Sequence, residues 1–173
     1  PQRAAGRVAV DRQLRKRLEA RFADTLAGPI RQRHDETEIR VAPGDFIEVI
    51  TALHDEPDLA FVVLADLSGV DTGDTMNVTF HLWSATTPDW LRVVCEPLPR
   101  DNPRIPTLTG LWPGAEWTER EVFDMFGIRF DGHPDLRRIL LWEAYPAHPL
   151  RKDYPLRGRG EREDYRTIER DSA

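Results

Sequence analysis

Acidic side chains and histidines that could perform chemistry gather in the last third of the chain. Glu119, Glu121 and Asp124 precede His133 and His148, and carboxylates with imidazoles can hold a divalent metal or transfer protons. Their spacing does not fit such a site, because there is no His-Glu-x-x-His pair and no second histidine one helical turn away. We therefore expect no catalytic, cofactor-binding or metal-binding residue in this chain. A free-standing metal-dependent hydrolase that uses His133 and His148 is an alternative.

Both histidines precede a proline and are followed by an arginine. The proline holds the histidine backbone extended, and the nearby positive charge disfavours a cation site. The imidazoles and guanidiniums can then satisfy carbonyls and carboxylates of this chain, or those of a partner subunit. Arginine suits subunit contacts because its guanidinium binds a carboxylate through two hydrogen bonds. We predict that the following residues contact a partner: Glu119, Arg120, Glu121, Asp124, His133, Arg137, Arg138, His148, Arg151, Lys152 and Asp153.

A short helix is expected to orient these residues. Thr118 followed by Glu121 is typical of a capping box, in which each side chain accepts a hydrogen bond from the backbone of the other residue. Trp117 and Val122 then stand where a hydrophobic staple would fix the direction of entry. Gly127 is the residue type that ends helices. The pattern predicts a helix that begins near residue 118 and ends before Gly127.

Composition excludes several classes of function. The net charge of −6 disfavours non-specific binding to nucleic acid. Cys95 is the single cysteine, so this chain has no internal disulfide and no all-cysteine metal site. It shares a strand face with Leu91 and Val93, which predicts a small core residue. No apolar run approaches the about 18 residues of a membrane span.

The rest of the chain predicts the elements that position these groups. Apolar residues at helical spacing indicate helices over 11–27 and 46–54, after a loose lead-in at 1–10. Alternating or short apolar runs indicate strands over 37–41, 59–64, 77–83 and 90–95. This order predicts an α+β fold, in which helices cover a mostly antiparallel sheet of about four strands.

The chain is expected to divide into three parts. Residues 1–113 would form an α+β domain with its N-terminal helix, and residues 114–157 a docking segment continuous with that domain. Residues 158–173 form a charged tail with almost no apolar side chains, which cannot build a core. We expect this tail to be disordered or to serve as an extended arm that orders on a partner.

Two blocks resemble a known family. Residues 119–140, EREVFDMFGIRFDGHPDLRRIL, resemble the signature of the respiratory-chain NADH dehydrogenase 30 kDa subunit, which is the C subunit of bacterial complex I and the J subunit of its cyanobacterial and plastid relative. Residues 148–155, HPLRKDYP, resemble the family's second block. Weaker likeness extends over about 35–157. The chain departs from the family at Ala147, where glycine is usual, and at Trp142, where an acidic residue is common.

The resemblance implies a non-catalytic subunit in the peripheral arm of the proton-pumping NADH:quinone oxidoreductase. Such a subunit carries no cofactor, while the whole complex uses FMN, iron–sulfur clusters, NADH and quinone. It would dock on the 49 kDa (D) subunit and also meet the B and I subunits. Its place would be the cytoplasmic face of the bacterial plasma membrane, or the matrix or stroma side in an organelle. An alternative is the homologous subunit of a membrane-bound hydrogenase or of a ferredoxin- or F420-linked dehydrogenase.

Overall fold

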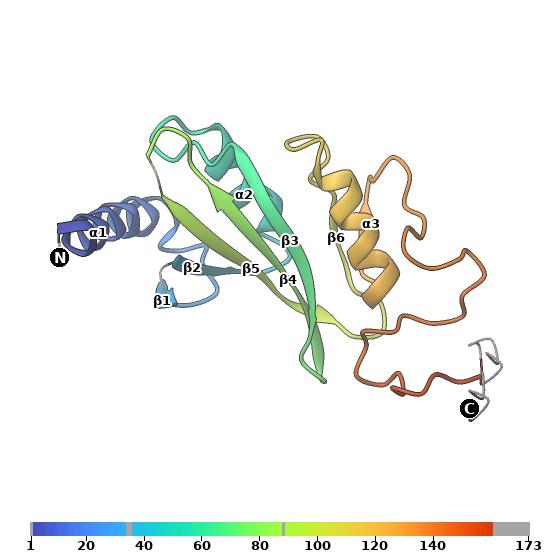
Figure 1. The fold of residues 1–173 in the computed structure, drawn as a ribbon. Helices are drawn as coiled ribbons and strands as arrows, with labels where there is room; N and C mark the ends of the chain where they lie inside the picture. The colour runs from blue at the N-terminus through green and yellow to red at the C-terminus, as the bar shows by residue number, and fades with distance from the viewer. Residues whose placement is uncertain (1, 34–35, 88, 161–173) are drawn as a thin grey trace, which may run out of the picture.

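The computed structural model describes residues 2–33, 36–87 and 89–160, with side chains from residue 12 onward. A five-stranded sheet in the order β1-β2-β5-β4-β3 forms the centre of this part, and a second sheet has two strands, β6 and β7 (Figure 1). The elements are α1 (Gln2–Phe22), β1 (Arg31–Arg33), β2 (Glu36–Val41), α2 (Phe46–Asp55), β3 (Val63–Asp71), β4 (Thr75–Trp83), β5 (Trp90–Pro99), β6 (Arg104–Pro106), α3 (Ala115–Phe126) and β7 (Arg129–Asp131).

The large sheet is mostly antiparallel, as predicted. Strand β2 pairs in parallel with β5, and the pairs β1–β2, β4–β5 and β3–β4 are antiparallel. The α+β class is therefore confirmed, with five strands in place of about four. The extra strand is β1, whose three exposed polar residues give no apolar pattern to detect.

The strand expected at 59–64 is wrong. Residues 57–59 form a turn, and Ala60 has a positive φ of 45°, so the strand β3 begins only at Val63. Leu59 and Phe61 are buried as expected, but Phe61 reaches the core from a loop and donates its N–H to the Leu53 carbonyl at 2.9 Å. The strand instead continues to Asp71, because pairing with β4 overrides the weak strand propensity of its polar residues.

Helix α1 is longer at its start and shorter at its end than predicted. It begins at Gln2, so the expected loose lead-in at 1–10 is wrong for the described residues. It ends at Phe22 because Leu26 leaves the helix to form an isolated bridge with Val41 of β2. The spacing of Leu14, Leu18, Phe22 and Leu26 predicts one apolar face; the first three are buried on α1, whereas Leu26 is only partly buried and lies beyond the helix.

Helices α2 and α3 cover the same face of the large sheet. Phe46 of α2 packs against Phe80 of β4 with ring centroids 5.0 Å apart. Phe126 of α3 packs so closely on β3 that a Cβ added to Gly69 would lie 2.6 Å from its ring. The register places Gly69 and Phe80 on the same side of the sheet, so the core lies between this face and the helices.

Cys95 is a small core residue, as predicted. It pairs with Val78 of β4 and is fully buried. Burial, together with the nearby charge of Glu96, raises the pKa of the thiol to about 12. A thiol in this environment stays protonated and unreactive.

The small sheet ties the C-terminal part of the chain to the domain. Strand β6 pairs in parallel with β7, and Ile105 opposite Phe130 is buried. This pairing joins residues before the expected boundary at 113 to residues after it. Among the described residues, no helix is long and apolar enough to cross a membrane.

Candidate docking site

Helix α3 carries the start of the first family block, and it begins one turn earlier than predicted. Gly114 precedes the helix without a side-chain cap, and Thr118 donates its hydroxyl to the Ala115 carbonyl at 3.2 Å. The predicted capping box is therefore wrong. The staple is also wrong, because Trp117 is exposed. Ala115 and Val122 are both buried on one face, so packing extends the helix upstream of its local cap signal.

The end of α3 is as predicted. Gly127 adopts a left-handed conformation with φ of 76°, and its N–H bonds to the Phe123 carbonyl. A Cβ at this position would lie 2.7 Å from the His148 ring. Gly127 thus both ends the helix and makes room for the second family block.

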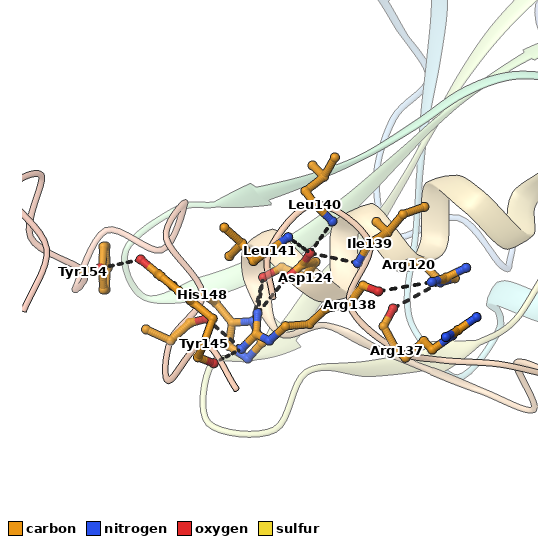
Figure 2. A network of polar contacts seen from close by, with 11 residues as sticks. Arg120, Asp124, Arg137, Arg138, Ile139, Leu140, Leu141, Tyr145, His148 and Tyr154 are labelled. Carbon is orange, nitrogen blue, oxygen red and sulfur yellow. Dashed lines mark hydrogen bonds and ion pairs between the residues drawn. The ribbon is translucent and has the colours of Figure 1, made fainter. Parts of the chain in front are cut away.

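Asp124 is the centre of a buried polar cluster (Figure 2). Its Oδ2 atom accepts the backbone N–H groups of Ile139, Leu140 and Leu141 at 3.0, 2.8 and 2.9 Å. Its Oδ1 atom accepts from Arg138 Nη1 at 2.6 Å. Burial raises the pKa of Asp124, but these hydrogen bonds outweigh it and hold the pKa below its usual value.

Two arginines complete the attachment of the loop to α3. Arg120 donates from Nε and Nη2 to the carbonyls of Arg137 and Arg138, both at 3.1 Å. Arg138 donates from Nη2 to the carbonyls of Tyr145 and Ala147 at 2.7 and 2.9 Å. The guanidiniums therefore donate to backbone carbonyls of this chain. These bonds take the place of the backbone hydrogen bonds that a helix or strand would provide.

The histidines also bind this chain. The His148 ring nitrogen Nδ1 lies 2.9 Å from the Asp124 carbonyl, and burial lowers its pKa, as do the charges of Arg138 and Arg151. His133 Nε2 lies 3.0 Å from the Glu116 carbonyl, while its Nδ1 accepts the Asp135 N–H at 3.0 Å. These two bonds assign His133 the neutral Nε2–H tautomer. We call Arg120, Asp124, Arg138 and His148 the loop clamp.

Glu119 has a different structural role. It is fully buried and accepts from Thr107 Oγ1 at 2.6 Å and from the Leu108 N–H at 2.7 Å. Burial raises its pKa, and these hydrogen bonds compensate only in part. Glu119 therefore joins α3 to the segment after β6.

A second attachment, missed in the sequence, centres on Asp71 at the end of β3. Its buried carboxylate pairs with Arg100 and accepts the N–H groups of Gly73 at 2.8 Å and Lys152 at 2.7 Å. Arg100 also pairs with Asp153 at 3.2 Å. Asp71 and Lys152 are 81 residues apart, so no local pattern could have indicated the contact. Lys152 contributes its backbone amide here.

Replacing Asp71 with asparagine should loosen the second family block. Burial raises the pKa of Asp71, but the bonds from Arg100, Lys152 and Gly73 lower it to about 2. Its contribution to stability is therefore present above the ordinary aspartate pKa and is lost as the pH falls through about 2. We expect Asp71→Asn to reduce the free energy of unfolding at pH 7 by about 2–3 kcal/mol. Denaturant titration at pH 7 and pH 2 checks this, since equal losses at both would contradict it.

The structure divides the eleven predicted contact residues into three groups. Glu119, Arg120 and Asp124 are buried, so their side chains are not on the surface of this chain. Four side chains are half-buried and bound within the chain: His133, Arg138, His148 and Arg151. Four are exposed: Glu121, Arg137, Lys152 and Asp153. Contact of the exposed group with a partner stays a prediction.

The loop that the clamp holds is exposed on its outer side. We call residues 139–156 the docking loop. It exposes large apolar side chains at Leu140, Trp142, Leu150 and Leu156, none of which was among the predicted contact residues. The sequence around these four residues has no helical or alternating apolar pattern, and this was its only indication that they do not belong to the core.

The described residues do not assemble a metal site. No group of three or more histidine, cysteine, aspartate or glutamate side chains lies within reach of one ion in this part of the chain. His133 bonds to backbone groups through both ring nitrogens, and His148 does so through Nδ1. The geometry therefore gives no support to the metal-dependent hydrolase.

The fold and its paired blocks match one protein family. The model of the respiratory-chain NADH dehydrogenase 30 kDa subunit matches residues 39–160. The C subunit of NADH-quinone oxidoreductase from Roseiflexus sp. (strain RS-1) is 44% identical over 146 residues, which cover 82% of each chain. The chain belongs to the complex I 30 kDa subunit family. Within that family it is similar to the C subunit of NADH-quinone oxidoreductase.

Some relatives are longer than this chain. The C/D subunit of NADH-quinone oxidoreductase from Sulfurihydrogenibium sp. (strain YO3AOP1) is 41% identical over 147 residues. The match covers 83% of this chain but only 24% of that protein. For the C 2 subunit of Rhizobium meliloti (strain 1021), 44% identical, the match covers 65% of the relative.

Two solved structures share the fold. A trypsin-resistant fragment (1–134) of Nqo5 matches with a TM-score of 0.61 and 30% identity, over 72% of this chain and 99% of the fragment. A chain of an archaeal membrane-bound sulfane sulfur reductase matches with a TM-score of 0.69, over 84% of this chain and 85% of that one. At 23% identity the second likeness shows the fold alone.

Proposed function

We propose that this chain is a non-catalytic peripheral-arm subunit of a proton-pumping NADH:quinone oxidoreductase and that it docks on the D (49 kDa) subunit. It stabilises the quinone-reducing module and binds no FMN, iron–sulfur cluster, NADH or quinone of its own. The B and I subunits are further neighbours. The subunit works at the cytoplasmic face of the plasma membrane, or on the matrix or stroma side in an organelle.

The fused relative is the observation that supports this proposal most directly. A protein named as a C/D subunit carries a segment 41% identical to 83% of this chain. Two subunits that work as one covalent chain in one organism must lie within reach of each other there. The simplest arrangement in other organisms is the same contact between separate chains.

The geometry supports a structural role in this partnership. The charged side chains of Arg120, Asp124 and Arg138 in the loop clamp bind backbone groups of the docking loop and of the residues just before it. Charges bound in this way are not available for turnover, but they give the loop a fixed shape. A preformed surface loses less conformational entropy when it binds.

Co-purification tests the proposal. The tagged chain is produced together with the D subunit encoded by the same genome, and the two are passed through affinity and size-exclusion columns. The proposal predicts one peak with both chains in equal amounts, identified by mass spectrometry. Separate elution of the two chains, each folded by circular dichroism, would contradict it.

A related complex is the second candidate. The fold shared with a chain of the sulfane sulfur reductase shows that this architecture also occurs in another respiratory membrane complex. The three relatives of about 40% identity described for this chain are all NADH-quinone oxidoreductase subunits, which favours the first candidate. Mass spectrometry of a native pull-down separates the two, because a hydrogenase or a ferredoxin- or F420-linked dehydrogenase would bring different subunits.

A further inference from the structure

We propose that the apolar side chains of the docking loop, Leu140, Trp142, Leu150 and Leu156, form the surface that binds the D subunit. This inference rests on the proposed function, and it names the residues that perform it. It also changes the expectation from the sequence, in which charged residues made the contact. The charges shape the loop, and the apolar side chains bind.

Exposure of large apolar side chains is concentrated in this loop. The exposed fractions are 62% for Leu140, 55% for Trp142, 55% for Leu150 and 91% for Leu156. The other exposed large apolar side chains in the described residues are Ile47, Val62, Val63, Val70, Trp90 and Trp117, which are spread over α2, α3, two strands and a loop. Four such side chains within 17 residues indicate an interaction surface, whereas single ones are ordinary.

The loop is held firmly enough to present these side chains. The backbone N–H of Leu140 is bonded to Asp124, and the N–H of Leu150 is bonded to the Met125 carbonyl at 3.1 Å. Trp142 packs edge-on against the ring of Tyr145, with centroids 4.7 Å apart. Leu140 and Leu150 are thus fixed to α3 through their own backbone, and Trp142 follows Leu141, which is fixed in the same way. The side chains of Leu140, Trp142 and Leu150 therefore stay exposed to solvent although the backbone at or beside them is hydrogen-bonded to α3.

The position of the loop favours the D subunit as the occupant. The docking loop first runs along the outer side of α3, then returns to the end of β3, where the Lys152 N–H bonds to Asp71, and leads to the C-terminal end of the described chain (Figure 1). In the C/D relative, the order of the name places the D part after the C part. In that order, the docking loop is the last exposed apolar segment of the described residues before the D part.

The chemistry of the loop fits a lasting contact. Permanent interfaces are more apolar than the rest of the protein surface. Tryptophan is among the residues that contribute most to binding when it enters a pocket on the partner. The partner is therefore expected to offer an apolar pocket for Trp142, bordered by groups that can meet the exposed charges of Arg137 and Asp153.

The test compares two double variants. Trp142→Ser with Leu150→Ser removes two side chains of the surface, and Trp90→Ser with Ile47→Ser removes a matched pair, 40% and 41% exposed, far from the loop in sequence. Binding of each to the purified D subunit is measured by calorimetric titration. We expect the loop variant to bind at least about thirtyfold more weakly and the matched variant to bind as the unaltered chain does.

The outcomes separate the inference from the proposed function. Unchanged binding by the loop variant, or an equal loss in both variants, would overturn the inference while the association with D stands. If the unaltered chain does not bind D, both are overturned. Equal thermal unfolding of the variants and the unaltered chain shows that a loss of binding is not a loss of fold. As a second readout, D should slow tryptic cleavage after Arg137 and Lys152 but not after Arg33, and equal rates would also count against the inference.

Discussion

The substitution Asp124→Asn is expected to lower the free energy of unfolding at pH 7 by about 3–5 kcal/mol, because it breaks a buried ion pair. An amide in this place can still accept the three N–H groups through one oxygen. Its NH₂ group then faces the guanidinium of Arg138, whose side chain is only 12% exposed. Arg138 would be left as a buried charge without its carboxylate. Urea titration followed by tryptophan fluorescence measures the change.

Glu119→Gln is the matched control on the same helix. It makes the same change of carboxylate to amide at another fully buried position. The partners of Glu119 are a hydroxyl and one N–H, so no charge is left unpaired. We expect a change within about 1 kcal/mol at pH 7. A loss as large as that of Asp124→Asn would show that burial, not the pairing with Arg138, determines the cost.

The two carboxyls should also respond to pH in opposite directions. The pKa of Asp124 is lowered in the folded state, so its contribution is present above the ordinary aspartate pKa and is lost as the pH falls. The pKa of Glu119 is raised, so its contribution is present below the ordinary glutamate pKa and is lost as the pH rises. The deficit of Asp124→Asn should therefore shrink in acid. Glu119→Gln should gain relative to the unaltered chain as the pH rises through the raised pKa.

Gly127→Ala is expected to be the other severe substitution. The left-handed backbone at Gly127, with φ of 76°, costs about 1–2 kcal/mol for a residue with a Cβ. The new Cβ would also lie 2.7 Å from His148 Cδ2. His148 is bonded to the Asp124 carbonyl and cannot move without releasing it, which adds about 1–3 kcal/mol of overpacking. We expect a total loss of about 2–5 kcal/mol by the same urea titration.

Gly73→Ala separates the two costs. Gly73 also has a positive φ, of 103°, but a Cβ there would meet nothing within 4 Å. Its loss should be limited to the backbone cost of about 1–2 kcal/mol. If Gly127→Ala is no worse than Gly73→Ala, the close packing of His148 against the helix end does not contribute to stability.

Much of the fold could be predicted because local patterns agree with tertiary packing. The alternation in Thr75–Trp83 and Trp90–Pro99 places one set of side chains in the core, and the apolar spacing in Phe46–Asp55 does the same for a helix. Strand β3 was misplaced because its residues Ser68 and Gly69 give no strand signal. Both residues are in a strand because β3 pairs with β4, and a side chain at Gly69 would collide with the Phe126 ring.

The sequence located the docking site, but it did not separate the residues that hold the loop from those that are exposed to a partner. The charged residues of both blocks were recognised, and their contacts could not be assigned to this chain or to a partner. Asp124 meets Ile139 to Leu141 only after the chain turns at Gly127 and Gly132, both with positive φ. Asp71 meets Lys152 across 81 residues. Bonds of this kind depend on the completed fold, and no spacing rule contains them.

The central claim is that the charges of the family blocks hold the docking loop in shape before any partner arrives. Amide hydrogen exchange in the isolated chain at neutral pH tests it directly at Ile139, Leu140 and Leu141, which lie in no helix or strand. Bonding to Asp124 predicts protected amides at these residues, and loss of that protection in Asp124→Asn while the amides of β4 stay protected. Exchange at these amides as fast as in an unfolded chain, in the unaltered protein, would contradict the account.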